Sequence, residues 1–172
     1  MENNDDIRFL EKKFMNEILG SIRDSWPVLF DTFVILPSTE EEDTKLSFDV
    51  IICGIPISVR IREYKYINYR ESNGSRTGLT IRSGSKCGRT TEIDKLRNGS
   101  GKLYFYSWMD QNEESIIGWL LIDIDKIRDK LDRFGKEHKN YDGTYFKSYG
   151  YSFLENNNAI INKGNLNSIS SY

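Results

Sequence analysis

The N-terminal segment carries apolar side chains at helical spacing. Between residues 5 and 24 these side chains stand three or four positions apart, at Ile7, Leu10, Phe14, Met15, Ile18, Leu19 and Ile22. This spacing is typical of an amphipathic helix that turns one face to a core. Asp5 and Asp6 suit its N-terminus, where the helix dipole favours negative charge. The pattern predicts a helix over 5–24, which Pro27 prevents from continuing.

The pattern then changes to that of strands. Residues 30–37 are predicted to form a strand, and the acidic loop 38–43 that follows is too polar to be buried. Two further strands, 45–54 and 55–64, follow one another with little more than Gly54 between them. So short a connection predicts a tight antiparallel hairpin.

The second hairpin strand alternates strictly. Its apolar and polar positions fall on opposite faces, with Ile57, Val59 and Ile61 on one and Ser58, Arg60 and Arg62 on the other. The apolar face is expected to meet the core. The other face presents two arginines side by side.

The rest of the chain continues to mix strands and helices. Strands are predicted at 77–82, 102–108 and 115–124, helices at 91–99 and 124–135, and an extended aromatic segment at 143–155. Thr91 suits the N-cap of the first of these helices, and a glycine closes each of them. The aromatic residues at 104–108 and Trp119 are expected in the core, because they stand in apolar strands.

This order of elements predicts an α/β or α+β fold with a central mixed β-sheet flanked by helices. A length of 172 residues suits one domain. We expect that domain to span residues 1–155. The polar, Asn/Ser-rich segment 156–172 is expected to fray.

Composition narrows the class of protein. Hydrophobic residues make up 38% of the chain and aromatic residues 13%, which is enough apolar surface for a globular core. Cys53 and Cys87 are too few and too far apart for a disulfide scaffold or a CxxC metal site, so a reduced compartment is expected. The N-terminus is acidic, and no apolar run approaches the roughly 20 residues that span a bilayer. We therefore expect a cytoplasmic protein without a membrane partner.

Charge is distributed unevenly although the net charge is only −2. Residues 1–57 carry 5 Lys/Arg against 12 Asp/Glu, residues 58–102 carry 11 against 4, and residues 103–172 carry 8 against 10. The basic middle third sets up a local potential that suits an anionic partner. The alternative is that its arginines pair with the acidic first third after folding.

Common catalytic motifs are absent from the sequence. The single histidine, His138, stands in a polar stretch and is better explained as an exposed linker residue than as a member of a catalytic triad. No phosphate-binding GxxxxGK[ST] or GxGxxG motif occurs, and the glycine-rich stretch 98–102 lies between a predicted helix and a strand, in the order opposite to that of a nucleotide loop. We interpret this stretch as a turn.

Two carboxylates stand where a partner is required. Asp49 lies within a predicted strand, where aspartate is unfavourable. It is explained either by a salt bridge to Arg60 or Arg62 or by a divalent cation. Glu11 falls within the apolar arc of the first helix, so it is either part of a structural ion pair or a second acidic member of the same site.

These elements resemble the core of the PD-(D/E)XK, or restriction-endonuclease-like, superfamily over residues 5–125. The similarity rests on a helix with Glu11, a strand with Asp49, a tight turn, a strand with Ser58 and Arg60 at alternate positions, and a following helix and strand. It implies that Asp49 is the metal-binding aspartate, that Glu11 is the helix glutamate and that Ser58-Val59-Arg60 stands at the (D/E)xK element. The resemblance further implies a Mg²⁺ cofactor, held by Asp49 and Glu11, and hydrolysis of DNA phosphodiesters.

Two departures from that pattern indicate a degenerate active site. Ser58 replaces a carboxylate and brings no negative charge to a metal. Arg60, a permanent cation, replaces the lysine that orients the attacking water. Metal affinity and catalysis are therefore expected to be weakened or lost.

The sequence leads to two hypotheses. In the first, the protein is a nuclease-superfamily member that binds or cleaves DNA, of the kind that phages, mobile elements and defence loci carry. Its DNA-binding residues would be Arg60, Arg62, Arg82, Arg89 and Lys95, with neighbouring tyrosines stacking on bases. In the second, it is a non-catalytic inhibitor or regulatory module whose acidic segment 38–43 docks on a protein partner. The tyrosines are equally explained as strand residues packed in the fold.

Overall fold

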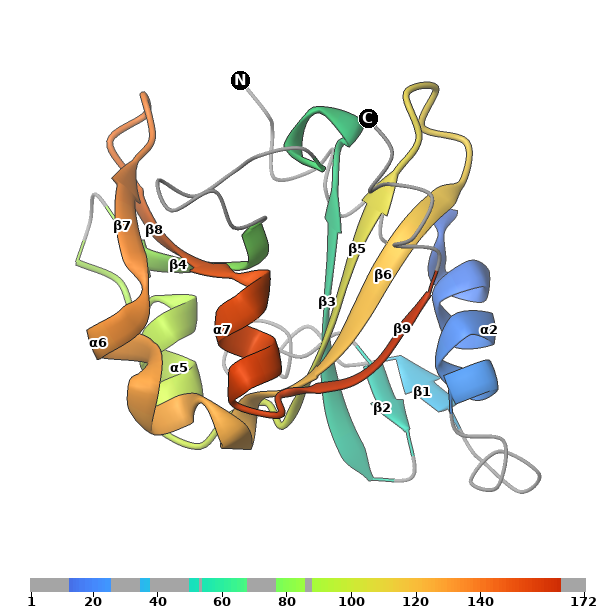
Figure 1. Ribbon diagram of the computed structural model, residues 1–172, viewed down its shortest axis with the longest axis horizontal. Helices are drawn as coiled ribbons and strands as arrows, with labels where there is room; N and C mark the ends of the chain where they lie inside the picture. The colour runs from blue at the N-terminus through green and yellow to red at the C-terminus, as the bar shows by residue number, and fades with distance from the viewer. Residues whose placement is uncertain are drawn as a thin grey trace.

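The computed structural model describes residues 13–25, 35–37, 50–52, 54–67, 77–85 and 88–164. Its largest element is a six-stranded sheet in the order β1-β2-β3-β5-β6-β9 (Figure 1). The strands span Ile35–Pro37, Val50–Ile52, Ile55–Arg62, Leu103–Met109, Ile116–Asp123 and Ile160–Gly164. β3 and β5 pair in parallel, and the other neighbouring pairs are antiparallel. The expected mixed sheet flanked by helices is therefore present.

The predicted hairpin joins β2 to β3. Val50 pairs with Ile57 and Ile52 with Ile55 in antiparallel register. Gly54 has φ +75°, a left-handed conformation that a side chain would strain. The tight turn therefore depends on a glycine at the position where the sequence places it.

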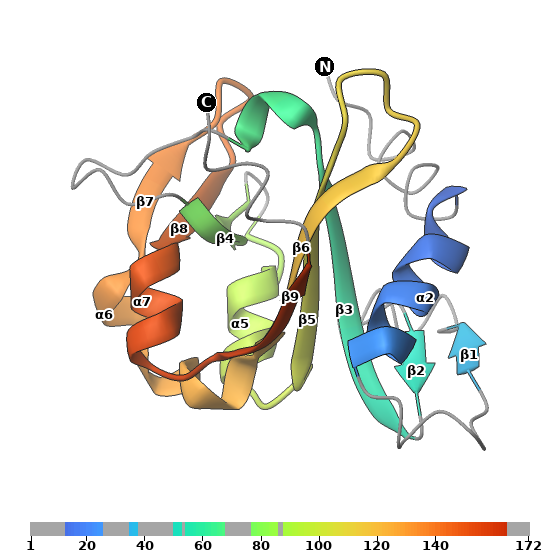
Figure 2. The same ribbon diagram turned by 45° about the vertical axis from the view of Figure 1, so that its right-hand side comes forward.

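Helix α2 (Met15–Ser25) covers one face of the large sheet (Figure 2). Phe14, Ile18 and Ile22 are buried against the apolar face of β3, which presents Ile57, Val59 and Ile61. The Ile116 N–H donates to Glu17 Oε1 at 3.0 Å and ties the helix to β6. The helical periodicity and the alternation of β3 are both confirmed within the described residues.

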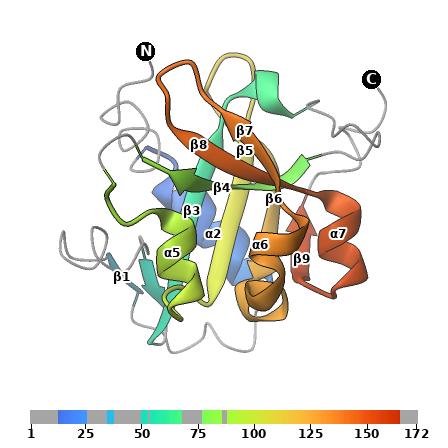
Figure 3. The ribbon, with the colours of Figure 1, turned by 90° about the vertical axis from the view of Figure 1, so that its left-hand side faces the viewer.

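A second, three-stranded sheet covers the opposite face. Its order is β4-β8-β7, with strands Thr77–Gly84, Tyr145–Gly150 and Lys136–Lys139, and it crosses the strands of the large sheet (Figure 3). Between the two sheets lie Tyr104, Tyr106 and Trp108 of β5, all buried. The segment 77–82 is thus a strand as predicted, but it does not belong to the central sheet. The polar strand β7 was not predicted.

Three short helical segments follow β6 instead of the continuous helix predicted at 124–135. They are η2 (Ile124–Lys126), η3 (Arg128–Lys130) and α6 (Leu131–Phe134). Ile124 and Ile127 are buried three positions apart, a spacing that suits a 3₁₀ turn as well as an α-helix. Arg128 donates to the Leu96 and Gly101 carbonyl oxygens, which holds this turn against the loop after helix α5 (Glu92–Arg97).

The C-terminal part of the chain also differs from expectation. The aromatic segment 143–155 is only partly extended, because helix α7 (Tyr151–Asn156) follows β8. Gly78 fits beneath this helix, where an added Cβ would stand 2.7 Å from Leu154 Cδ1. Beyond residue 155, where fraying was expected, β9 pairs with β6 and extends the large sheet. No helix in the described ranges is long and apolar enough to cross a membrane.

Candidate anion-binding pocket

A cavity of about 340 Å³ opens where the polar face of β3 meets the second sheet. Its walls come from β3, η1 (Tyr64–Tyr66), β4, the start of α5 and the β7–β8 hairpin. The charged and aromatic residues among its lining are Arg60, Arg62, Lys65, Tyr66, Arg82, Glu92, Tyr141, Asp142, Tyr145 and Phe146. Three arginines that the sequence predicts for DNA binding therefore line one cavity. We call it the arginine pocket.

Arg60 forms an ion pair with Glu92 on one wall of the pocket. Arg60 Nη2 lies 3.2 Å from both carboxylate oxygens. The Tyr104 hydroxyl donates to Glu92 Oε1, and the Arg82 backbone N–H donates to Oε2 at 3.0 Å. The two side chains are only 21% and 11% exposed. Glu92 therefore joins β3, β4, β5 and α5 in one buried polar cluster.

This cluster fixes the charge of Glu92. Burial alone would raise the pKa of Glu92, but the charge of Arg60 and the hydrogen bonds from Tyr104, the Arg82 amide and Arg60 outweigh it and hold the pKa below its ordinary value. Burial, reinforced by the charge of Glu92, raises the pKa of Tyr104 well above its usual range. At neutral pH the cluster thus contains a guanidinium, a carboxylate and a neutral phenol that donates.

The sequence around α5 places Glu92 at the first helical position. The Asp94 carboxylate accepts from the Thr91 N–H at 2.9 Å and from Thr91 Oγ1 at 2.7 Å, which fixes the start of the helix at Thr91 as predicted. At the other end, Gly99 has φ +88° and its N–H donates to the Leu96 carbonyl at 3.1 Å. Both ends of this short helix are closed, so Glu92 is held facing β3.

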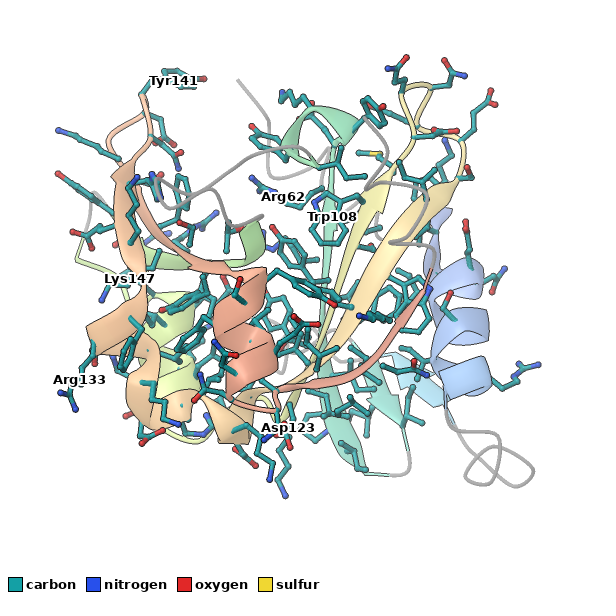
Figure 4. All side chains as sticks on the ribbon, viewed as in Figure 1. Arg62, Trp108, Asp123, Arg133, Tyr141 and Lys147 are labelled. Carbon is teal, nitrogen blue, oxygen red and sulfur yellow. The ribbon has the colours of Figure 1, made fainter. Side chains whose placement is uncertain are left out.

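Arg62 has a different environment from Arg60, although the two share a face of β3. Its guanidinium carbon lies 4.2 Å from the centre of the Tyr66 ring. The Nε of Arg62, like that of Arg60, is buried and makes no hydrogen bond within the described ranges, but no ion pair there joins Arg62 to a carboxylate. Figure 4 shows Arg62 beside β3, on the side that faces the second sheet. The two arginines therefore differ in the carboxylate partner that Arg60 has and that Arg62 lacks in the described ranges.

The remaining pocket charges are distributed between paired and open groups. Lys65 Nζ lies 2.6 Å from Glu63 Oε2, and that hydrogen bond raises the pKa of Lys65. Asp142 Oδ1 accepts from the Thr144 N–H at 2.9 Å and from Thr144 Oγ1 at 2.7 Å. The Arg82 side chain is exposed, and no carboxylate in the described part of the chain pairs with its guanidinium. Asp142 keeps its negative charge, but four cationic side chains face two carboxylates among the described lining residues, so the net charge of the described lining is positive.

The other site residues predicted from the sequence either lie outside the described residues or do not line the arginine pocket. Glu11 and Asp49 lie outside the described residues, as does the acidic segment 38–43. Ser58 is 3% exposed, and an added Cβ on Gly101 would stand 3.4 Å from its Oγ, so Ser58 lies beneath the loop after α5. Arg89 and Lys95 do not line the pocket; Arg89 is exposed before α5 and Lys95 belongs to that helix.

The described residues do not fit a Mg²⁺ ion at the position of the (D/E)xK element. Glu92 is the nearby carboxylate, and its oxygens already accept from Arg60, Tyr104 and the Arg82 amide. A guanidinium in contact with that carboxylate would also repel a divalent cation. Across the described ranges, no group of three or more His, Cys, Asp or Glu side chains could hold a metal ion.

Sequence reasoning missed Glu92, Tyr104 and the β7–β8 loop. Glu92 could have been noticed as a carboxylate at the start of a capped helix within an otherwise basic segment. Tyr141 stands between Asn140 and Asp142-Gly143, and an aromatic residue inside such a polar turn is an exposed ring by expectation. His138, expected in an exposed linker, instead lies in β7 and stacks on Phe146 of β8, at 4.8 Å between ring centres.

Comparison of the chain with models of protein families, with curated proteins and with solved structures found no match.

Proposed function

We propose that this protein binds DNA, with the phosphate backbone contacting Arg62 and Arg82 in the arginine pocket. The observation that carries the proposal is that Arg62 and Arg82 line one cavity and that neither guanidinium pairs with a carboxylate in the described ranges. A guanidinium presents N–H donors in a planar fork that matches the acceptor oxygens of a phosphate.

The balance of charge in the pocket favours an anion. Among the described residues that line it, four are cationic (Arg60, Arg62, Lys65 and Arg82) and two are anionic (Glu92 and Asp142). Arg62 and Arg82 remain without a carboxylate partner in the described ranges. A polymeric anion is favoured over a small one because the basic segment continues outside the pocket, where Arg89 is exposed.

The arrangement of the large sheet supports a restriction-endonuclease-like core. Helix α2, the β2–β3 hairpin, helix α5 and strand β5, which pairs in parallel with β3, occur in the chain order that the resemblance implies, with β1 before the hairpin and η1 and β4 after it. At the (D/E)xK position, however, Ser58 is buried and Arg60 is engaged by Glu92. We therefore propose that the pocket binds DNA without cleaving it. Hydrolysis through Asp49 and Glu11 stays a prediction of the sequence.

The direct test is equilibrium binding of labelled 20-nucleotide DNA, single-stranded and duplex, at 50 mM NaCl. The double variant R62A/R82A should bind about 100-fold more weakly, because each lost hydrogen-bonded phosphate contact is worth roughly tenfold. The matched control K126A/R133A removes the same charge outside the pocket (Figure 4 labels Arg133) and should change affinity less than about twofold. Equal losses in the two double variants, or no binding at low salt, would exclude the proposal. Inorganic phosphate as competitor tests the alternative of a small anion.

Cleavage is tested in the same samples with Mg²⁺ added. We expect intact DNA. Cleavage that the D49A variant abolishes would instead support hydrolysis at the site predicted from the resemblance.

A further inference from the structure

Tyr141 is exposed at the tip of the β7–β8 hairpin. Its side chain is 84% exposed, against 58% for Phe134 and 38% for Ile161, the other large apolar residues exposed in the described ranges. It makes no ring, charge or hydrogen-bond contact with another described residue. Figure 4 shows its side chain at the outer end of the hairpin. A ring exposed in this way contributes little to the fold and is accessible to a ligand.

The turn that carries Tyr141 is well ordered by its own hydrogen bonds. The Asn140 N–H donates to the Thr144 carbonyl at 2.8 Å, and the Gly143 N–H donates to the Asn140 carbonyl at 3.0 Å. Asn140 Nδ2 donates to Thr144 Oγ1 at 2.9 Å. Gly143 has φ +83°, which favours glycine at that position. The turn therefore fixes the backbone from which the ring projects, so that contact with a ligand does not require the loop itself to be ordered.

Tyr141 lines the same cavity as Arg62 and Arg82. The other rings on that wall are engaged: Phe146 stacks on His138, and Lys139 Nζ lies 5.7 Å from the centre of the Tyr145 ring. Across the cavity, Tyr66 lies beneath the Arg62 guanidinium. Tyr141 is thus the pocket aromatic whose faces are open.

We propose that Tyr141 stacks on an unpaired base of a DNA strand whose phosphates contact Arg62 and Arg82, so that single-stranded DNA is the preferred ligand. This inference rests on the proposed function. Cationic side chains that follow the backbone, together with an aromatic ring beside them, are the features by which proteins bind single strands. In a duplex both faces of an internal base are covered by its neighbours, and Tyr141 would have no free face to contact.

The test uses Y141A, Y141F and the control F134A, which removes an exposed ring outside the pocket. Each is titrated with a 12-nucleotide oligo-dT and with an abasic strand of equal length. Y141A should bind oligo-dT about tenfold more weakly, whereas Y141F and F134A should bind within about twofold of the natural protein. On the abasic strand the effect of Y141A should vanish.

Two results would overturn the inference. One is equal affinity of Y141A and the natural protein for oligo-dT, and the other is a loss of equal size on the abasic strand. These two results bear on Tyr141 only if the double variant R62A/R82A weakens DNA binding. If R62A/R82A binds as well as the natural protein, the proposed function itself is wrong. Tighter binding of duplex than of single-stranded DNA would also contradict the preference. Because Tyr141 is exposed, Y141A should unfold at the same urea concentration as the natural protein.

Discussion

Arg60 and Arg62 have the same chemistry and point to the same face of β3, yet their surroundings differ. Arg60 lies in a closed cluster with Glu92 and Tyr104. Arg62 lies over Tyr66, and no carboxylate in the described ranges pairs with it. The comparison shows that a shared sheet face does not give two arginines a shared role. The element packed opposite each one decides whether it holds the fold together or remains available to a ligand.

The largest difference between the two should appear in stability. R60M leaves the Glu92 carboxylate buried beside Tyr104 without its counter-ion, which should lower the free energy of unfolding by about 3 kcal/mol. R62M removes no ion pair found in the described ranges and should cost less than about 1 kcal/mol. Urea denaturation at pH 7 measures both.

A double variant sharpens this result. R60M/E92M replaces the ion pair with apolar side chains and should recover most of the stability that R60M loses, because no charge is left buried. Equal costs for R60M and R62M, or no recovery in the double variant, would show that the cluster does not hold the fold together.

DNA affinity should depend more on Arg62 than on Arg60, which is the opposite of the order expected for stability. R62M should weaken binding of oligo-dT about tenfold, because a hydrogen-bonded phosphate contact is lost. R62K keeps the charge but loses the planar fork over Tyr66, so its affinity should fall between those of R62M and the natural protein. Anisotropy titrations measure this series. Two results together would contradict this prediction. R62K would bind as weakly as R62M, and folded R60M would bind more weakly than both.

The Glu92 cluster should also make stability depend on pH. The pKa of Glu92 is lower in the folded protein than in the unfolded chain, so folding favours the ionised carboxylate. Its contribution is complete above the unfolded-state pKa, near the ordinary value of 4.5, and is lost as pH falls through the folded-state pKa. The stability difference between the natural protein and E92Q should therefore be largest near pH 7 and shrink in acid. A difference that stays constant from pH 7 to acid would contradict this assignment.

The smallest effect is expected for arginine outside the pocket. R89A removes one exposed charge of the basic segment outside the pocket and should weaken DNA binding only about twofold and change stability by less than about 0.5 kcal/mol. The same titrations and urea curves measure it. An effect as large as that of R62M would extend the binding surface beyond the arginine pocket.

Local patterns were enough to predict β3, β4 and α5, which form part of the pocket wall. Alternation with a period of two in β3 and the cap signals of α5 depend on neighbouring residues, so both were visible in the sequence. The prediction of one continuous helix at 124–135 was wrong because the spacing of Ile124 and Ile127 suits a 3₁₀ turn equally well. β9 was missed because it is a short edge strand with polar alternate positions.

The partner of Arg60 could not be predicted from local patterns. Glu92 is 32 residues away and reaches Arg60 only because the chain crosses over from β3 to the parallel strand β5 through β4 and α5. The sequence suggested the acidic first third as the counter-charge, whereas this carboxylate comes from within the basic segment. Arg82, Tyr66 and Tyr141 likewise meet in one cavity only through the packing of two sheets.

The most direct test of the account is the salt dependence of single-stranded DNA binding by R62M and R60M, under conditions in which both variants are folded. The slope of log affinity against log salt concentration reports the number of phosphates that the protein neutralises. We predict that the slope of R62M is smaller than that of the natural protein by about 0.7, whereas R60M keeps the natural slope. A natural slope for R62M, or a reduced slope for R60M alone, would contradict the assignment of Arg62 to the ligand and Arg60 to the fold.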